Sequence, residues 1–247
     1  MELDTYVINL PRSEDRRRRM AEQLDRLGLA YTLFPAVDGK ARWDELAPTV
    51  DMPAFDRNTG RGVLPGEIGA YHSHLEVWRA FGATGRSVAL VLEDDVVFHD
   101  DFLAALNAAL SARGRWDLLK LNHIRAKQAV RVGTAGGWNL NAYHGPFTGF
   151  GGYLITRELA RRLAVEMLPI RRPIDREADR VHIYRFLHLG LEPYPSHVED
   201  HGQSTITGTN FAAVKKRPWY RRIPSYCDRL STLIGKARYL RQIKPPL

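Results

Sequence analysis

The stretch Ser87–Phe98 reads SVALVLEDDVVF and sets three adjacent carboxylates at the end of a hydrophobic run. Apolar residues 88–92 precede the acids Glu93, Asp94 and Asp95, and a further apolar stretch follows them. This pattern predicts a buried parallel strand with the acids at its mouth. Clustered like charges are unfavourable unless a cation meets them. The residues alone leave two interpretations open, an ordinary acidic turn and a metal site.

The size and composition of the chain fit one α/β domain with appendages. Its 247 residues are enough for one sizeable core. The first residues, MELDTYVIN, do not resemble a signal peptide, and no stretch approaches the roughly twenty apolar residues of a membrane span. We therefore expect a cytoplasmic protein. The single cysteine, Cys227, excludes an intrachain disulfide framework and a cysteine-rich zinc site.

The net charge of +8 is concentrated near the C-terminal end. Residues 211–247 contain ten Lys or Arg and one acid, Asp228, for a charge of +9, so that residues 1–210 sum to −1. A near-neutral body with a basic tail favours local contact with an anionic surface over nucleic-acid binding. We predict a body over residues 1–210, a basic amphipathic extension over residues 211–247, and no nucleic-acid partner.

The extension has apolar residues at helical spacing with basic residues among them: Tyr226, Leu230, Leu233, Ala237 and Leu240, with Arg229, Lys236, Arg238 and Arg241. A helix of this kind over residues 215–244 can lie on the anionic inner face of a membrane. Docking of the helix onto the body is the alternative.

Strand and helix patterns alternate through at least residue 165, which indicates an α/β fold. Residues 41–65 have no clear period and are expected to form a long loop over a site. Strands are predicted at Thr5–Leu10, Tyr31–Val37, the Ser87 stretch, Trp116–Asn122 and Gly145–Thr156, and helices after Ser13, through Ile68–Trp78, from about Asp100, after Thr156 and within Pro173–Gly190. Two parallel strands joined by a helix begin a nucleotide-binding type of sheet.

Ligands of an open α/β sheet bind beyond the carboxyl ends of its strands. The chain places Pro11–Arg16, Asp38–Gly39 and the acidic triplet at such ends, and we expect the three loops to converge on one crevice. A divalent cation there would bridge the carboxylates to the phosphate oxygens of a nucleotide diphosphate. By their position after the first strand and in this crevice, Asn9, Leu10, Arg12, Arg16, Asp38 and Gly39 are predicted to bind the nucleotide.

Six segments along roughly residues 4–206 carry a resemblance to a known family: VINLPRSEDR, PGEIGAYHSHLEVW, LVLEDDVVF, GGYLITRELARRL, PIDRE and HGQSTI. Their order and spacing resemble glycosyltransferase family 25, which includes bacterial lipooligosaccharide and collagen galactosyltransferases. The resemblance implies a GT-A type fold, a Rossmann-like mixed sheet flanked by helices. It also implies an inverting enzyme that uses Mn²⁺ or Mg²⁺ to move a hexose, galactose, from a UDP-sugar to a lipopolysaccharide, lipooligosaccharide or other lipid-linked glycan.

By this resemblance the acidic triplet stands where GT-A enzymes carry an Asp-x-Asp motif. Asp95 is the implied metal ligand, and Asp94 or Glu93 the implied partner of the ribose or sugar hydroxyls. In an extended strand Glu93 and Asp95 would point to one side and Asp94 to the other. His201 is the candidate for a second metal ligand, with His197 as the next candidate, and a surface histidine in a polar loop is the alternative interpretation.

An inverting transfer needs a base that deprotonates the acceptor hydroxyl. Asp175 is the candidate because it opens a predicted helix, whose dipole stabilises its ionised form, and because the family motif places an aspartate there. Helix capping is the alternative role, and Glu177 and Asp179 are alternates for the base.

Two other classes of function remain open. A sugar-nucleotide nucleotidyltransferase would also use acids and a metal, although no glycine-rich phosphate loop with a lysine lies near the first strand. A non-enzymatic module could bind nucleic acid or membrane through the basic extension.

Overall fold

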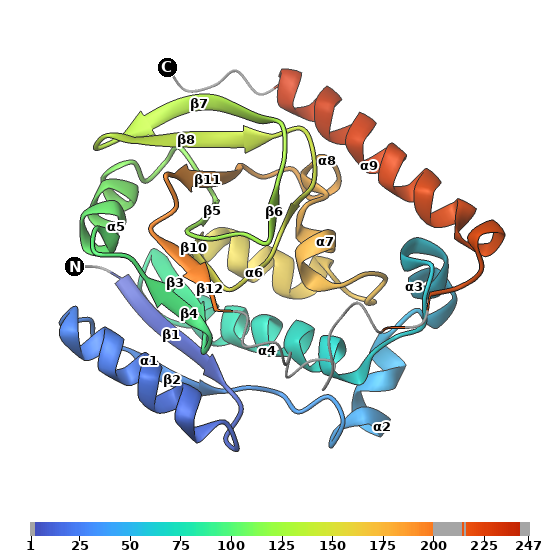
Figure 1. The fold of residues 1–247 in the computed structure, drawn as a ribbon, viewed down its shortest axis with the longest axis horizontal. Coiled ribbons are helices and arrows are strands. Elements are labelled where there is room, and N and C mark those ends of the chain that lie inside the picture. Colours follow the sequence, from blue (N-terminus) through green and yellow to red (C-terminus); the bar gives the residue numbers. More distant parts are fainter. Residues whose placement is uncertain (1–2, 200–213, 215, 243–247) are drawn as a thin grey trace.

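The computed structural model describes residues 3–199, 214 and 216–242, and an eight-stranded mixed sheet forms its centre (Figure 1). The strand order is β2-β1-β3-β10-β5-β11-β8-β7. The strands are β1 Leu3–Asn9, β2 Thr32–Pro35, β3 Val88–Glu93, β5 Leu118–Lys120, β7 Ala129–Ala135, β8 Trp138–Tyr143, β10 Gly152–Thr156 and β11 His188–Glu192. β1 is parallel to β2 and β3, β5 is parallel to β11, and the remaining pairs are antiparallel. The predicted α/β fold class, a Rossmann-like mixed sheet flanked by helices, is confirmed.

Helices cover both faces of this sheet, and the strand side chains alternate between two cores. In β3, Val88, Leu90 and Leu92 face one core, and Ala89 and Val91 face the other. The first core contains residues of α1 Glu14–Arg26 and α5 Phe102–Ser111, and the second contains residues of α4 Pro65–Gly82, α6 Arg157–Glu166 and α7 Ile174–Ala178. A central strand that is apolar on both faces therefore reads as a continuous hydrophobic run, as β3 does.

The expectation that residues 41–65 form a long loop is wrong. This segment contains α2 Trp43–Leu46, a 3₁₀ turn η1 Ala47–Thr49 and α3 Met52–Thr59. The carboxylate of Asp51 caps α3 by accepting a hydrogen bond from the Ala54 backbone N–H at 3.0 Å, and Phe55 is fully buried. Helices this short repeat their apolar positions too few times to show a clear period.

Two smaller sheets and a hairpin accompany the main sheet, and two predicted strands are divided between them. β4 Val96–Phe98 pairs with β12 Ser196–Val198, and β6 Arg125–Ala126 pairs with β9 Phe147–Thr148. The Ser87 stretch contains β3 and β4, and Gly145–Thr156 contains β9 and β10. β7 and β8 form a hairpin that turns at Gly136 and Gly137, both at positive φ. The predicted helical segment 173–190 divides into α7, α8 Val181–Tyr184 and the start of β11.

The described part of the C-terminal extension is a short turn, η3 Trp219–Arg222, followed by α9 Ile223–Gln242, which packs against α3 and α8 (Figure 1). A side chain at Gly235 would overlap the ring of His182, with a Cβ only 2.3 Å from its Cδ2. Glycine inside a helix is unfavourable, and here it permits close packing on α8. The predicted boundary at residue 210 lies outside the described residues and stays a prediction. None of the helices in the described ranges has the length and apolar character needed to cross a membrane.

Candidate functional site at the carboxyl ends of the strands

The acidic triplet lies at the end of β3, beside the end of β1. Asn9, the last residue of β1, donates a hydrogen bond from Nδ2 to Asp94 Oδ2 at 2.6 Å. From α1, Arg16 Nη1 lies 3.1 Å from Asp94 Oδ1 and 3.3 Å from Asp95 Oδ2. The alternation of Glu93 and Asp95 against Asp94 required an extended strand, and this condition is not met, because β3 ends at Glu93 and the two aspartates form a turn. The turn places both aspartates on one guanidinium.

This cluster holds more negative than positive charge. Burial raises the pKa of Asp94, and burial together with the negative charge of Glu93 raises the pKa of Asp95 to about 7. Asp95 Oδ1 is buried and has no hydrogen-bond partner among the described residues. A buried carboxylate oxygen without a partner is unfavourable unless it gains a proton or a cation. The arrangement is therefore suited to accept a cation at Asp95.

A complete metal-binding group is not formed by this cluster alone. Within residues 3–199, 214 and 216–242, no group of three or more His, Cys, Asp or Glu side chains is placed to hold a metal ion. His201, the predicted second ligand, lies outside the described residues. His197, the next candidate, lies in β12, where its Nδ1 is 2.9 Å from His99 Nε2. A cation bound at Asp95 would need its remaining ligands from outside the described residues or from the phosphate oxygens of a nucleotide.

Glu93 faces a buried hydrogen-bond chain that the sequence did not predict. His74 Nε2 lies 3.2 Å from Glu93 Oε1, and His74 Nδ1 lies 2.9 Å from the Tyr153 hydroxyl. That hydroxyl accepts a hydrogen bond from Trp78 Nε1 at 2.9 Å. The hydroxyl then donates to Nδ1, which leaves Nε2–H to donate to Glu93. This hydrogen-bond chain fixes the orientation of the Glu93 carboxylate. In the sequence, only the histidine His74 in the segment GEIGAYHSH hints at it.

A groove of about 450 Å³ lies beside the ends of β1 and β2. Of the predicted nucleotide-binding residues, Leu10, Arg12 and Asp38 line it. Arg12 and Asp38 form an ion pair across the groove, and the hydrogen bond from Arg12 lowers the pKa of the Asp38 carboxyl. The structure thus brings together the three loops that were expected to converge, with Asn9 and Arg16 at the triplet and Leu10, Arg12 and Asp38 in the groove.

Gly39 has a packing role in this region. A Cβ on Gly39 would lie 1.8 Å from the Pro65 carbonyl oxygen, and one on Gly69 would lie 2.5 Å from the Val37 carbonyl oxygen. Ser73 Oγ accepts a hydrogen bond from the Val37 backbone N–H at 2.8 Å. The backbone around Asp38 is therefore fixed against the start of α4, and contact of Gly39 with a nucleotide stays a prediction.

Asp175, the candidate base, lies at the start of α7. Its Oδ2 accepts a hydrogen bond from the Gly149 backbone N–H at 3.0 Å, and its Oδ1 accepts one from the Arg176 backbone N–H at 2.7 Å. Pro173 occupies the N-cap position of α7, so Asp175 stands inside the first turn and ties α7 to the Gly149 loop. Asp175 is half-buried and forms no ion pair with any described residue.

The two alternates for the base are held in buried ion pairs. Glu177 Oε2 lies 2.9 Å from Arg172 Nη1, and its Oε1 lies 3.0 Å from Arg180 Nη1. Asp179 is paired with Lys236 of α9. Burial raises the pKa of Glu177, but Arg172 and Arg180 outweigh it and lower that pKa overall, whereas burial raises the pKa of Asp179. Asp179 is nevertheless occupied by Lys236 and by the Phe147 backbone N–H, and it is buried away from an acceptor. Of the three acids, Asp175 is best placed to act as a base.

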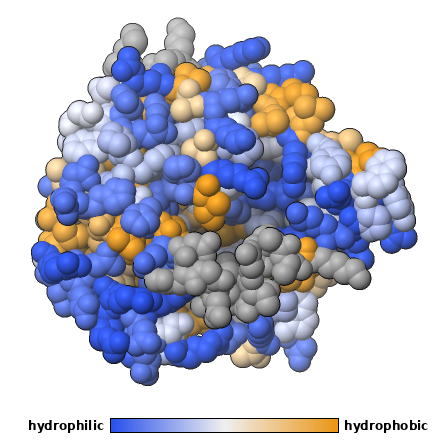
Figure 2. Space-filling model, in the orientation of Figure 1, coloured by the Kyte–Doolittle hydropathy of each residue, from blue (hydrophilic) through white to orange (hydrophobic). Residues whose placement is uncertain are grey.

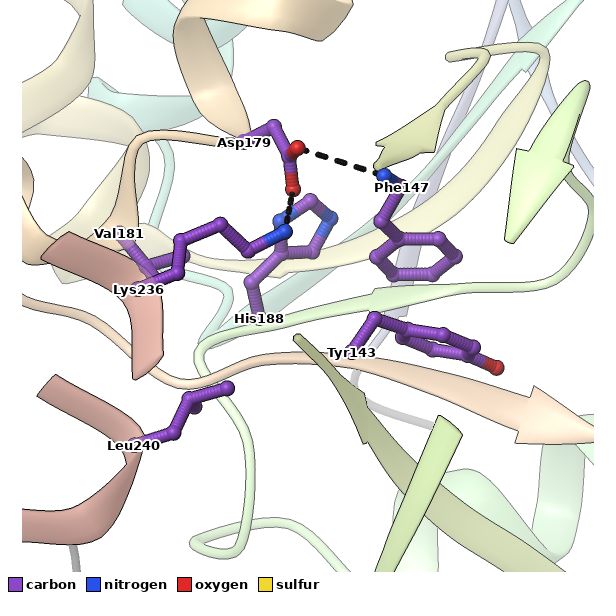
Figure 3. Close-up of a pocket in the computed structure, with 7 residues that line it drawn as sticks. All are labelled: Tyr143, Phe147, Asp179, Val181, His188, Lys236 and Leu240. Atoms are coloured by element: carbon purple, nitrogen blue, oxygen red, sulfur yellow. Dashed lines mark hydrogen bonds and ion pairs between the residues drawn. The ribbon is translucent and has the colours of Figure 1, made fainter. Parts of the chain in front are cut away.

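A buried polar cluster links α9 to the loop that contacts Asp175. Lys236 reaches from α9 to Asp179 (Figure 3). It also donates a hydrogen bond to the Gly145 carbonyl at 2.8 Å. Asp179 accepts a hydrogen bond from the Phe147 backbone N–H at 3.3 Å, next to a small cavity of about 10 Å³. The fully buried Lys120 donates a hydrogen bond to the carbonyl oxygen of the same Phe147 at 3.1 Å. Burial lowers the pKa of Lys120 to about 7.

Among the described residues, Arg16 is the cation that forms ion pairs with Asp94 and Asp95. Its replacement by glutamine should leave the negative charge of these two carboxylates without an opposite charge. We expect the free energy of unfolding to fall by about 2–3 kcal/mol, and added Mn²⁺ to restore part of that loss. Urea denaturation with and without Mn²⁺ measures both effects. The matched control is Arg18→Gln, whose exposed side chain pairs with Asp15 and should matter little. Equal effects of the two substitutions would contradict this account of the cluster.

The fold is a Rossmann-like mixed sheet flanked by helices, and comparison with known proteins gives its family. Residues 2–177 match the family described as "Glycosyltransferase family 25 (LPS biosynthesis protein)". The match covers the acidic triplet, the groove and Asp175. The chain belongs to glycosyltransferase family 25.

Curated relatives agree with this assignment but differ in activity. An Aedes aegypti "Glycosyltransferase 25 family member" is 32% identical over 69% of this chain and 29% of that protein. The Xenopus laevis "Procollagen galactosyltransferase 1-A" is 29% identical over 84% of this chain and 38% of that protein. The Homo sapiens "Inactive glycosyltransferase 25 family member 3" is 30% identical over 68% of this chain and 31% of that protein. The chain spans about a third of the length of these relatives.

One solved structure is more distantly similar. A Bacillus anthracis protein described as a glucose-1-phosphate thymidylyltransferase gives a TM-score of 0.42 at 9% identity, over 92% of this chain and 95% of that chain. This similarity is too low to carry an argument.

Proposed function

We propose that the protein is an inverting, metal-dependent glycosyltransferase that moves a hexose from a UDP-sugar to a glycan acceptor. The observation that carries the proposal is the acidic triplet, where Asp95 Oδ1 is buried without a partner among the described residues. Asn9, which holds Asp94, directly precedes Leu10, and Leu10 lines the groove together with Arg12 and Asp38. An excess of buried negative charge at the carboxyl end of a strand suits a cation that also binds a diphosphate.

The nucleotide would lie along the ends of β1 and β3. Asp95 would hold Mn²⁺ or Mg²⁺, and Glu93 or Asp94 would bind the ribose or sugar hydroxyls. When bound, the cation neutralises the charge of the departing nucleotide diphosphate. Arg12 and Asp38 would contact the nucleotide in the groove, and the contact between Arg16 and the two aspartates would hold the loop in place. His201 stays a proposed second ligand.

Asp175 would remove the proton from the acceptor hydroxyl. The hydroxyl oxygen then bonds to the anomeric carbon, the bond from that carbon to the diphosphate oxygen breaks, and UDP leaves with the electron pair from the opposite face of the sugar. The backbone N–H groups of Gly149 and Arg176 orient the carboxylate. Each carboxylate oxygen can still accept another hydrogen bond, so the ties to the backbone leave room for the acceptor hydroxyl.

The relatives support one donor sugar and one class of acceptor for this proposal. The name of the Xenopus laevis relative supports galactose as the sugar, and the family description supports a lipopolysaccharide or lipooligosaccharide acceptor. A cytoplasmic site of action, where UDP-sugars are used, belongs to the same proposal.

Calorimetric titration of UDP, with and without Mn²⁺, tests the nucleotide site. We expect Mn²⁺-dependent binding in the wild type and a loss of affinity of at least about tenfold, or about 1.4 kcal/mol, in Asp95→Asn. The matched control is Asp101→Asn, an exposed acid at the start of α5 that makes no side-chain cap. A well-folded wild type that does not bind UDP would make the triplet a structural acidic turn.

The released product separates the proposal from its nearest alternative. With UDP-galactose and a lipooligosaccharide acceptor, the proposed reaction releases UDP. A sugar-nucleotide nucleotidyltransferase would instead make or consume pyrophosphate. Detection of pyrophosphate exchange without UDP release would replace the proposal by that alternative.

A further inference from the structure

The face of α9 that points away from the body is apolar along most of its length. Ile223, Tyr226, Leu230 and Ile234 recur at helical spacing and are all exposed, Leu230 by 58%. Trp219 and Tyr220 of η3 extend the same row at the N-terminal end of the helix and are also exposed. Spacings of three and four residues place side chains on one side of a helix. Six large apolar side chains in one row differ from the singly scattered apolar residues of an ordinary surface.

The opposite face of α9 is bound to the body by buried ion pairs, which keep the apolar row exposed to solvent. Lys236 is buried against Asp179, and Asp228 forms an ion pair with Arg172, with 3.1 Å between Arg172 Nε and Asp228 Oδ2. Tyr239 is buried as well, and Gly235 lets the helix approach His182 closely. Rotation of α9 to bury its apolar row would break these ion pairs. The row is therefore a permanent surface of the folded protein.

The charge around the apolar row is positive. Exposed basic residues flank it and continue it toward the C-terminal end: Lys216, Arg217, Arg221, Arg229, Arg238 and Arg241. Asp228 is the only acid within residues 214–242, and it faces the body and is paired with Arg172 and Arg176. In Figure 2 the edge of the molecule at which Figure 1 places α9 shows hydrophobic residues next to strongly hydrophilic ones.

We infer that the outward face of α9 is a docking surface for an anionic lipid membrane, with its apolar row in the interface and its arginines on the headgroups. A helix with an apolar face and a basic border binds such surfaces by apolar burial together with attraction to anionic lipids. A second copy of the chain is a poorer occupant, because its own α9 would bring a basic face with no exposed acid to pair with these arginines.

Both alternatives for the C-terminal helix are thus realised on different faces. The helix docks on the body through Lys236, so this residue, expected among the lipid-facing ones, is not available to a membrane. The lipid-facing residues are instead the exposed row that contains Ile223, Leu230 and Ile234.

The surface also lies close to the acceptor side of the proposed site. Arg176, the residue after Asp175, contacts Asp228 of α9 at 3.6 Å. Membrane contact through α9 would therefore bring Asp175 near the bilayer surface, where a lipid-linked acceptor presents its sugars. This use of the surface rests on the proposed function, whereas the surface itself rests on α9 alone.

Co-sedimentation of the full chain with vesicles tests the inference. Vesicles of equal parts phosphatidylcholine and phosphatidylglycerol are compared with vesicles of phosphatidylcholine alone. We expect binding to the mixed vesicles and at least about a tenfold loss of affinity in the double variant Leu230→Ser, Ile234→Ser. Arg238→Gln and Arg241→Gln should each lower the affinity about fivefold. The matched control, Val165→Ser, removes an apolar side chain of α6 that is more exposed than Leu230 or Ile234, and this variant should bind as the wild type does.

Thermal melting of each variant shows whether it is folded, and UDP calorimetry shows whether the nucleotide site is intact, so that a loss of vesicle binding can be separated from both. Folded wild-type protein that ignores the mixed vesicles would overturn the inference, as would vesicle binding that the double variant retains. A dimer in sedimentation equilibrium that the double variant dissociates would assign the face to a second copy of the chain instead. Vesicle binding without UDP binding would overturn the proposed function and leave the surface intact.

Discussion

Asparagine in place of Asp175 is expected to lower kcat by about 10²–10⁴-fold, the range contributed by a general base. The amide is nearly the same size as the carboxylate, and its oxygen can still accept one of the two hydrogen bonds from Gly149 and Arg176. It cannot take up the proton of an acceptor hydroxyl. Because Asp175 is not among the residues that line the groove with Arg12 and Asp38, UDP affinity should change less than about twofold. Steady-state rates and UDP calorimetry measure the two effects separately.

Asp51 provides the matched control for this substitution. It also stands at the start of a helix and accepts a backbone hydrogen bond, from Ala54 at 3.0 Å, but it belongs to α3. Asparagine and aspartate are about equally good at a helix N-cap, so Asp51→Asn should be silent in both stability and rate. If Asp175→Asn keeps a rate close to that of the wild type, Asp175 acts only as a tie between α7 and the Gly149 loop.

The acidic triplet shows how far local sequence determines a site. An apolar run followed by acids located the end of a central strand and the edge of the sheet at which Arg16 and Asn9 also arrive. The orientation of the three side chains was not predictable in this way, because it depends on the turn at Asp94 and Asp95. That turn brings both aspartates to one arginine 78 residues away from Asp94 in sequence.

Tertiary packing explains the parts that the sequence did not predict. α3 has eight residues, too few for a clear period, although Asp51 and Pro53 are standard helix-start signals. The β7–β8 hairpin turns on Gly136 and Gly137, a pattern that a search for two-residue turns would find. The chain from Glu93 through His74 to Tyr153 is different in kind. It joins α4, β3 and β10, and no spacing along one element indicates it.

Lys236→Met is expected to lower the free energy of unfolding by about 3–5 kcal/mol, the cost of removing one partner from a buried ion pair. The methionine fills a similar volume, but Asp179 would remain buried with only the Phe147 backbone N–H at 3.3 Å as a hydrogen-bond donor. The Gly145 carbonyl would also lose its hydrogen bond from Nζ at 2.8 Å. Such a loss is a large share of the 5–15 kcal/mol that stabilises a typical domain. Urea denaturation measures it.

The double variant Lys236→Met, Asp179→Asn distinguishes a lost ion pair from lost packing. It removes the buried negative charge together with its cation, so most of the stability should return, and a coupling energy of about 1–3 kcal/mol should appear in the cycle. Arg238→Met, on the outward face of the same helix, is the matched control and should change stability by less than about 0.5 kcal/mol. A double variant no more stable than Lys236→Met would show that Lys236 acts through packing alone. Because Asp179 also holds Phe147, two residues from Gly149, the single variant should loosen the contact of Asp175 and lower kcat more than UDP affinity.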